Sequence, residues 1–351
     1  MLGKKINFAI IGCGKIAKKH LECIKTIENA SLVGVFDLSK EARINFARDN
    51  HVPEFSNLFE LNSIADPDVF VVLTPSGSHA QLVKDLSIFG KNIIVEKPIA
   101  LNINDAEEMI DVCSKNKSTL SIVKQNRFNK PIKLAKNLVC ENALGNLFLG
   151  TVRVRWSRDQ AYYDQASWRG TWKEDGGVVC NQAIHHIDML QWFFGDVHSV
   201  FSSNINAALD IEAEDTSVSV VKFKNGALGV IEASTAIRPK DLEGSISILG
   251  TKGSIEIGGF AMNEIVKFEI KNSDSFNFDK SSFINPNQFA FAHLEYYKDY
   301  VKTLQQNQAP TIDGHEALKS LKIVHAIYKS NNENREIVLD NEDLQTQLGA
   351  I

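Results

Sequence analysis

The sequence predicts an α/β protein of two domains, with a parallel sheet in the N-terminal domain and a large, mostly antiparallel, open-faced sheet in a C-terminal α+β domain. In the first third of the chain, short apolar runs alternate with helical patterns, which is typical of a parallel sheet covered by helices. Beyond residue 126 the runs become longer and alternate with period two, which indicates antiparallel strands. We therefore expect one domain over residues 1–126 and a second over residues 127–351, and the chain of 351 residues is long enough for both.

Composition excludes several classes of function. With 44% hydrophobic and 23% charged residues and a net charge of −5, the chain has no general electrostatic attraction to nucleic acid or to an anionic membrane. No segment is apolar enough to span a membrane, and the first apolar run is too short for a signal peptide, so we expect a cytoplasmic protein. The five cysteines have no CxxC spacing; we expect buried small residues in a reducing compartment, and no metal site.

The first apolar run, INFAII, is followed by GCGKIA and a helical pattern. In this G-x-G-x-x-A motif, Gly12 permits the tight turn, Gly14 lets a pyrophosphate approach the backbone, and Ala17 lets the helix lie close to the strand. The helix N-terminus, which includes Lys15 and Ile16, offers free N–H groups to phosphate. The motif predicts a Rossmann domain that binds a dinucleotide.

The second strand, LVGVF, identifies the preferred cofactor. It ends at Asp37, close to the offset of roughly 20 residues at which a carboxylate binds the adenosine ribose. A carboxylate there favours NAD over NADP, because it repels a ribose phosphate. Arg43 could reach the same place, but we expect it to be an exposed helix arginine.

Three more strands are expected at 68–74, 92–96 and 119–123, with helices at 78–89 and 104–116 between them. In such sheets ligands bind beyond the carboxyl ends of the strands, where TPSGSH (74–79) and EKP (96–98) stand. Lys97, held at such an end by Pro98, could lie near the nicotinamide; the alternative, which the residues alone favour, is a surface lysine in the loop. The other predicted cofactor contacts here are Thr74, Pro75, Ser76, His79 and Glu96.

The second domain is expected to open with a helix near 131–143 and to end with helices near 290–306 and 315–330. Hairpin turns are predicted at Asn225-Gly226 and at Thr251-Lys252-Gly253, and an exposed loop at 271–282. With helices on one face of the sheet, the other face is free to pair with another subunit.

Two stretches of this domain could carry chemistry. In RWSRDQAYYDQASWRGTW (155–172), Arg169 could grip a carboxylate or phosphate, while Tyr162, Tyr163 and Trp168 could stack on rings; the alternative is a packed loop with surface arginines. In NQAIHHIDMLQW (181–192), a helix starting after Gly176-Gly177 would put Asn181 and His185 on one face.

The adjacent histidines of this second stretch cannot easily bind one metal ion together, since they point in different directions from a helix. We therefore expect His185 or His186 to be functional and the other to be a satisfied structural group.

Taken in order, GCGKIA, Asp37, TPSGSH, EKP and GGVVCNQAIHHIDMLQW resemble the Gfo/Idh/MocA family of oxidoreductases over nearly the whole chain. In that family the EKP lysine and a D-x-x-x-H pair are catalytic, which implies Lys97, Asn181 and His185 here. The family's aspartate is replaced by Asn181, so the resemblance leaves open whether Lys97 or His185 accepts the proton.

Within the family, QNRFN (125–129), YYD and WRGTW resemble the subgroup that oxidises the C3 hydroxyl of UDP-N-acetylglucosaminuronic acid with NAD for O-antigen and lipopolysaccharide biosynthesis. The resemblance implies a homotetramer (a dimer of dimers), an aminotransferase that consumes the ketone, and a 2-oxo acid as a partner that recycles NADH. It adds Asn126, Arg127, Trp168 and Arg169 as cofactor contacts. The implied substrate contacts are Lys97, Arg155, Tyr162, Tyr163, Arg169, Asn181 and His185.

The expected mechanism has Lys97 hydrogen-bonding the C3 hydroxyl while His185, oriented by Asn181, removes its proton. Three alternatives remain open: a dehydrogenase of a free sugar or inositol, a non-enzymatic NAD-binding regulator, and an NAD-dependent glycosidase in which C3 oxidation begins the reaction.

Overall fold

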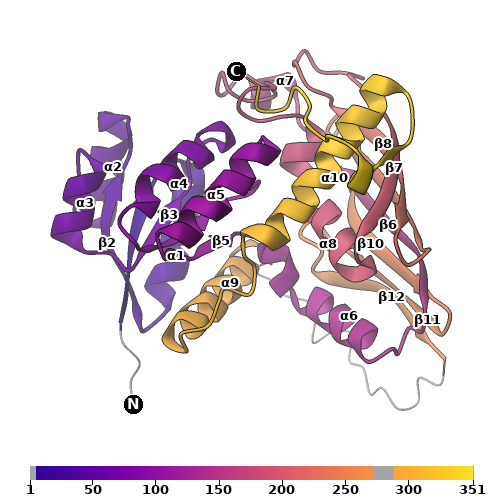
Figure 1. Ribbon diagram of the computed structural model, residues 1–351, viewed down its shortest axis with the longest axis horizontal. Helices are drawn as coiled ribbons and strands as arrows, with labels where there is room; N and C mark the ends of the chain where they lie inside the picture. Colours follow the sequence, from indigo (N-terminus) through magenta and orange to yellow (C-terminus); the bar gives the residue numbers. More distant parts are fainter. Residues whose placement is uncertain (1–4, 272–287, 351) are drawn as a thin grey trace. The chain divides into compact units, whose positions relative to one another are not determined.

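A computed structural model describes residues 5–271 and 288–350, which divide into two units (Figure 1). The first contains the described residues of Met1–Ala100, Asn104–Gln125 and Ala290–Leu318; the second contains those of Leu101–Ile103, Asn126–Phe289 and Lys319–Ile351. The chain thus changes unit at residue 126, and a later segment returns to the first unit, which no sequence pattern indicates.

The first unit is built on five parallel strands in the order β2-β1-β3-β4-β5, which confirms the expected Rossmann sheet. Most of their residues are buried because helices cover both faces, although residues 31–33 of the edge strand β2 and Asn7 of β1 are half-buried. The strands are β1 (Ile6–Ile11), β2 (Ala30–Phe36), β3 (Val69–Val72), β4 (Asn92–Val95) and β5 (Leu120–Ile122). The helices are α1 (Lys15–Thr26), α2 (Lys40–Asn50), α3 (Leu58–Ala65), α4 (His79–Ser87), α5 (Ile103–Lys115) and α9 (Gln288–Gln305), with a short 3₁₀ turn, η1 (Ser76–Ser78).

Helix α9 packs beside α1, on the face of the sheet that α1 covers. The Tyr297 ring of α9 contacts the Phe8 ring of β1, with centroids 5.7 Å apart, and the Tyr297 hydroxyl bonds His20 of α1. The returning segment therefore completes the core of the dinucleotide-binding unit.

The second unit holds an eight-stranded sheet in the order β12-β11-β10-β6-β9-β8-β7-β13. All pairs are antiparallel except β6 with β9, so the expected mostly antiparallel sheet is confirmed. The strands are β6 (Leu147–Arg155), β7 (Val197–Ile205), β8 (Thr216–Phe223), β9 (Leu228–Ser234), β10 (Glu243–Gly250), β11 (Gly253–Gly258), β12 (Glu264–Ile270) and β13 (Ile337–Val338). The helical segments are η2 (Gln125–Phe128), α6 (Lys130–Cys140), α7 (Gln160–Tyr163), η3 (Val178–Gln182), α8 (Ile184–Phe194), α10 (Gly314–Glu333) and η6 (Leu339–Asn341).

Both predicted hairpins form, at the β8–β9 and β10–β11 turns. Helix α8 covers one face of the sheet: Gly150 of β6 faces the Phe194 and Leu190 side chains so closely that no larger residue would fit. The predicted loop at 271–282 lies outside the described residues except for Lys271.

Candidate active site

The glycine turn of the first unit has the geometry that the sequence predicts. Gly12 has φ +98°, and a Cβ there would lie 2.9 Å from the backbone of Leu73, so only glycine fits. At Gly14, by contrast, a Cβ would meet nothing within 4 Å. The turn thus leaves open space at Gly14, at the N-terminus of α1, where a pyrophosphate can approach the backbone of the first helical turn, which begins with Lys15 and Ile16.

Asp37 is fixed at the end of β2 beside this turn. Its carboxylate accepts hydrogen bonds from the backbone N–H of Cys13 at 2.7 Å and of Ser39 at 2.8 Å. Burial, followed by the Asp37 charge, raises the pKa of the Cys13 thiol to about 12. The open turn and the preformed carboxylate together fit the phosphate and ribose of NAD.

Arg43 does not behave as expected, because it is only 8% exposed. Its guanidinium pairs with Glu54 and donates to the backbone oxygen of Asp37 at 3.0 Å. The reason is that α2 packs the arginine against the end of β2. It therefore supports the loop that carries Asp37.

His79 lies beneath the two polar loops at the strand ends. Its Nδ1 is 2.9 Å from the Pro98 carbonyl oxygen and its Nε2 is 3.0 Å from that of Thr74. Burial lowers the pKa of His79, which is 1% exposed, although both carbonyls favour a protonated ring. His79 thus ties the TPSGSH loop to the EKP loop; Thr74 and Ser76 are half-buried and Pro75 is exposed.

Glu96 belongs to a buried hydrogen-bond network. Its Oε2 accepts the Lys97 N–H at 3.0 Å and its Oε1 the Nε2–H of His20 at 3.0 Å, while Nδ1 of His20 lies 2.8 Å from the Tyr297 hydroxyl. Burial alone would raise the pKa of Glu96, but the hydrogen bond from His20 and the charges of His20, His293 and Lys97 hold it well below its usual range. The sequence did not predict a role for His20 or Tyr297, because no motif or spacing links α1 and α9 to the EKP loop.

His20, Glu96 and His293 could also hold a metal ion, since their ligand atoms lie within 4.8 Å of one another. Hydrogen bonds already account for both ring nitrogens of His20 and both oxygens of Glu96. The geometry therefore favours a hydrogen-bond network in which Glu96 and His20 hold the backbone of the EKP loop. Two cysteines are not buried as expected: Cys140 is exposed, because it ends α6 on the surface, and Cys13 in the glycine turn is half-buried.

In the second unit the stretch around Asn181 differs from the expected continuous α-helix. Residues Val178–Gln182 form a π-helix, η3, and α8 begins only at Ile184. The amide of Asn181 donates to the carboxylate of Asp175, which is 2% exposed and also accepts the Gly170 N–H at 2.8 Å. A carboxylate is thus present at Asn181 although the family's aspartate is not.

A chain of polar contacts links Asn181 to the aromatic, arginine-rich segment. Arg169 donates to the Tyr162 hydroxyl at 2.6 Å, and Nε2 of Gln182 lies 3.3 Å from that hydroxyl and 3.2 Å from Oδ1 of Asn181. The guanidinium of Arg169 stacks over the Trp168 and Tyr162 rings, with centroids 4.6 and 4.4 Å away. The structure therefore brings Tyr162, Trp168, Arg169 and Asn181 together; Gln182 was missed.

The two adjacent histidines lie in different surroundings. His185 is 9% exposed, one turn beyond Asn181. His186 is fully buried against the Trp156 ring, and burial lowers its pKa to about 3. Neither of its ring nitrogens has a hydrogen-bond partner among the described residues. His186 is therefore the buried histidine of the pair, but its ring does not have the hydrogen bonds that we expected for a structural histidine.

Three predicted site residues have other partners. Arg155 pairs with Glu232 and Glu243 on the sheet face opposite α8. Tyr163 is buried, its hydroxyl is 3.2 Å from the Thr235 hydroxyl, and burial raises its pKa to about 12.

Arg127 makes two 2.7 Å bonds to the buried Asp188 carboxylate. These contacts favour supporting roles for Arg127, Arg155 and Tyr163 within the second unit. Asn126 is half-buried at the start of that unit.

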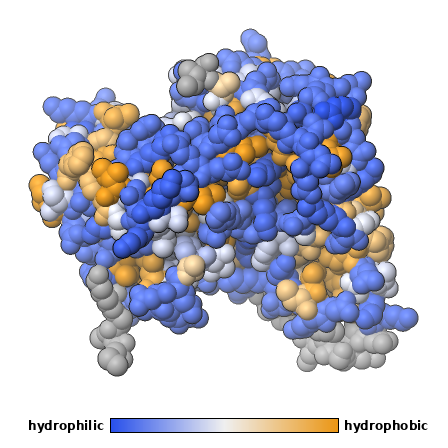
Figure 2. All heavy atoms as spheres, viewed as in Figure 1, coloured by the Kyte–Doolittle hydropathy of each residue, from blue (hydrophilic) through white to orange (hydrophobic). Residues whose placement is uncertain are grey.

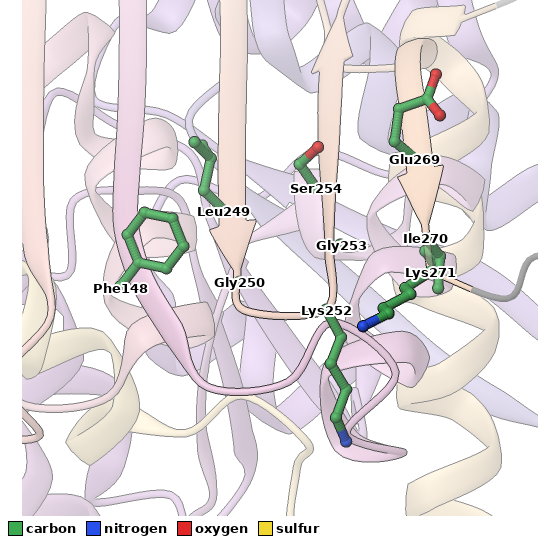
Figure 3. A pocket seen from close by; sticks show the side chains of 9 residues that line it. All are labelled: Phe148, Leu249, Gly250, Lys252, Gly253, Ser254, Glu269, Ile270 and Lys271. Carbon is green, nitrogen blue, oxygen red and sulfur yellow. The ribbon is translucent and has the colours of Figure 1, made fainter.

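Figure 3 shows a pocket of about 450 Å³ at one end of the eight-stranded sheet. It is lined by the ends of β6, β10, β11 and β12, including Phe148, Lys252 and Glu269. None of the predicted site residues lines it, so it is separate from the candidate active site.

Comparison with known proteins identifies the family. Residues 6–123 match the oxidoreductase family with an NAD-binding Rossmann fold, and residues 136–339 match the C-terminal alpha/beta domain of the same family, GFO_IDH_MocA. Myo-inositol 2-dehydrogenase of Thermotoga maritima is 27% identical over 95% of this chain and 99% of its own.

No helix in the described part of the chain is long and apolar enough to cross a membrane.

Two solved structures are more similar. The WlbA dehydrogenase from Bordetella pertussis, in complex with NADH and UDP-GlcNAcA, has 35% identity and a TM-score of 0.91 over 95% of this chain and 98% of its own. The WlbA dehydrogenase from Chromobacterium violaceum, in complex with the same two ligands, has 36% identity and a TM-score of 0.91 over 98% of each chain. The chain is therefore an NAD-dependent dehydrogenase of the Gfo/Idh/MocA oxidoreductase family.

Proposed function

We propose that this dehydrogenase oxidises the C3 hydroxyl of a UDP-N-acetylated hexuronic acid to the 3-keto sugar. The observation that carries the proposal is the contact chain Arg169–Tyr162–Gln182–Asn181, one turn before His185. The two WlbA structures, which hold UDP-GlcNAcA, support the same substrate class.

The chemistry of the contact chain suits such a ligand. Arg169 is half-buried, its Nη1 donates to the Tyr162 hydroxyl, and its planar guanidinium lies over the Tyr162 and Trp168 rings. A guanidinium held in this way is suited to bidentate binding of a carboxylate or phosphate, and the substrate carries both. A free polyol has neither group.

NAD, when bound to the first unit, supplies the hydride acceptor. Lys97 is proposed to hydrogen-bond the C3 hydroxyl and to stabilise negative charge on its oxygen as hydride leaves. His185 is proposed to remove the hydroxyl proton, with Asn181 orienting its ring and Asp175 orienting Asn181. Neutral Asn181 alone could not stabilise an imidazolium, whereas the Asp175 charge behind it can.

Ligand stabilisation tests the substrate class directly. We would measure the melting temperature with NAD, and then with NAD plus UDP-N-acetylglucosaminuronic acid, UDP-glucuronic acid or myo-inositol, while following NADH absorbance. The proposal predicts the largest added shift with the first sugar, and loss of most of it in Arg169→Gln. Arg335→Gln removes an exposed ion pair with Glu342 and serves as the matched control.

A free sugar or inositol is the second candidate, favoured by the similarity to myo-inositol 2-dehydrogenase. A shift and NADH production with myo-inositol, without a response to either UDP sugar, would establish it and would leave Arg169 a structural role.

The proposed setting follows from the same reaction. We propose a cytoplasmic enzyme of O-antigen and lipopolysaccharide nucleotide-sugar biosynthesis, whose ketone product is consumed by an aminotransferase and whose NADH is recycled by a 2-oxo acid. We further propose a homotetramer, built as a dimer of dimers.

The proposed assembly uses the open face of the eight-stranded sheet. Large apolar side chains are exposed there, and orange atoms alternate with blue ones along the right-hand rim of Figure 2, over this sheet. Phe201 lies opposite Val220 in the β7–β8 ladder, and Val218 projects from the same face. Arg153 and Glu232, which pair in the neighbouring β6–β9 ladder, add both signs of charge, so the face can be complementary to a second copy of itself.

A further inference from the structure

Glu214 is a buried carboxylate that contacts the π-helix η3 from behind. It precedes β8 and is 4% exposed. Its backbone oxygen accepts the Val178 N–H at 2.9 Å, and its side-chain Oε1 accepts the Val179 N–H at 2.9 Å. One residue therefore binds the first two N–H groups of η3.

The second glycine of the pair before η3, Gly177, has a physical explanation in this contact. A Cβ at Gly177 would lie 2.3 Å from both the carboxyl carbon and the backbone oxygen of Glu214. The Gly177 N–H, in turn, donates to the Tyr328 hydroxyl of α10 at 3.3 Å, and that hydroxyl donates to Oε1 of Glu214 at 3.1 Å. The backbone of residues 177–179 is therefore clamped at each consecutive N–H.

This clamp lies directly upstream of the residues proposed to act on substrate. The Asn181 N–H donates to the Gly177 oxygen at 3.0 Å, and the Ala183 N–H to the Val178 oxygen at 2.8 Å. A π-helix is rare and has poorer hydrogen-bond geometry than an α-helix, so it depends on its surroundings. A shift of residues 177–179 would move Asn181 and then His185 at the start of α8.

Charge makes the clamp sensitive to pH. Oε2 of Glu214 is buried and has no hydrogen-bond partner among the described residues. Burial raises the pKa of Glu214 to about 7, the bonds from Val179 and Tyr328 oppose that rise, and the adjacent Asp215 adds to it. The other titratable groups that face this site are Tyr328 of α10, Tyr163 of α7 and Cys180 of η3.

We propose that Glu214 is a positioning residue of the candidate active site, which holds η3 so that Asn181 and His185 meet the substrate in one geometry. The inference rests on the proposed roles of those two residues. When ionised, Glu214 accepts stronger, charge-assisted bonds from Val179 and Tyr328. The carboxylate form therefore holds η3 more firmly than the neutral acid.

The test compares wild type, Glu214→Gln and Glu212→Gln in the full chain. Glu212 is an exposed carboxylate two residues upstream that accepts the Trp172 N–H, so its variant controls for loss of charge nearby. Each protein would be assayed across pH with whichever substrate the wild type oxidises, together with NAD affinity. We expect Glu214→Gln to keep NAD affinity within about twofold and to lose turnover by roughly tenfold above pH 7, since small misplacements at a reacting group cost up to about 100-fold.

The pH dependence separates positioning from simple folding. Below about pH 6 the wild-type carboxyl is neutral like glutamine, so the deficit of Glu214→Gln should largely vanish there; a deficit independent of pH, or none at all, overturns the inference.

A measurement without substrate tests the role of Glu214 even if the proposed substrate is wrong. The ring NMR signal of His185, assigned with His185→Asn, should shift in Glu214→Gln and remain unchanged in Glu212→Gln. An unshifted signal would overturn the inference even if no substrate were found. If instead the signal shifts as expected while UDP-N-acetylglucosaminuronic acid is not oxidised, only the proposed function fails.

Discussion

Among single side chains, Lys97 offers the clearest separation of catalysis from cofactor binding. Its backbone N–H donates to Glu96 at 3.0 Å, which fixes the backbone at this proposed catalytic residue. We expect Lys97→Ala to lower kcat by roughly 100-fold or more, the usual contribution of such a group, while NAD affinity changes little. Steady-state kinetics and NAD titration measure both quantities. Lys115→Ala, at an exposed ion pair, is the control, and a Lys97 variant with weak NAD binding but full kcat would refute the assignment.

Asp175 is the residue that we expect to replace the family's missing carboxylate. In Asp175→Asn an amide would oppose the amide of Asn181, and the negative charge that Asn181 contacts would be lost. We expect kcat to fall by roughly 10- to 100-fold at unchanged NAD affinity. Asp164→Asn, which alters an exposed contact to Gln160, should keep wild-type kinetics. Equal kcat in wild type and Asp175→Asn would show that Asn181 needs no carboxylate.

Single residues also show how far sequence reasoning reaches into the site. Gly12 and Asp37 were predictable because a local motif fixes their backbone geometry and spacing. Asp175 and Gln182 were not, because their roles depend on a π-helical turn. Nor was His20, whose partners Glu96 and Tyr297 are far away in sequence.

At the scale of elements, Glu214, the residue that binds the π-helix η3, makes the free energy of unfolding depend on pH. The pKa of Glu214 is raised from 4.5 to about 7, so the folded state binds a proton more tightly than the unfolded chain does. This group's contribution to stability is full below about pH 4.5 and is lost as pH rises through 7. The loss amounts to about 3 kcal/mol for a shift of this size.

Denaturant unfolding at about pH 5 and about pH 8 measures this effect. Wild type should lose more unfolding free energy over this interval than Glu214→Gln, which has no proton to release. Identical pH dependence in the two proteins would contradict a buried, titrating Glu214.

The elements that the sequence patterns missed have physical reasons for being hidden. Strand β7 turns Ser199 and Ser202 inward, where they bond Glu336 and the hydroxyl of Ser219, so its buried face does not read as apolar. Helices α2 and α3 have the capping signals Ser39 and Asn57, each accepting an N–H three residues on, although the apolar periodicity of both segments is weak.

On the scale of the whole molecule, the class of both sheets followed from periodicity, since period-two runs and short buried runs specify different sheets. The return of α9 to the first unit could not be predicted, because Tyr296 and Tyr297 have the spacing of any buried helix face. Only the structure shows that their hydroxyls contact Ser121 and His20.

Assembly is the property of the whole molecule that the open sheet face should control. Val220→Lys would place a charge among the exposed apolar residues of that face, and we expect it to halve the assembly or reduce it further. Light scattering coupled to gel filtration measures the mass. Ile64→Lys, at an equally apolar exposed site on α3, should leave the mass unchanged. A Val220 variant of wild-type mass would exclude this face as the interface.

The central claim, oxidation at the C3 carbon of a UDP-N-acetylated hexuronic acid, is tested most directly by following the hydrogen that leaves. The enzyme would be incubated with NAD, a 2-oxo acid where turnover requires it, and UDP-N-acetylglucosaminuronic acid carrying deuterium at C3. NMR would then locate the label and the new carbonyl. We predict a ketone at C3 of the sugar and deuterium on the reduced nicotinamide. Where a 2-oxo acid has reoxidised the nicotinamide, we predict the deuterium on the hydroxy acid formed from that 2-oxo acid. Retention of the label at C3, with NADH formed from another position or from a free polyol instead, would contradict the account.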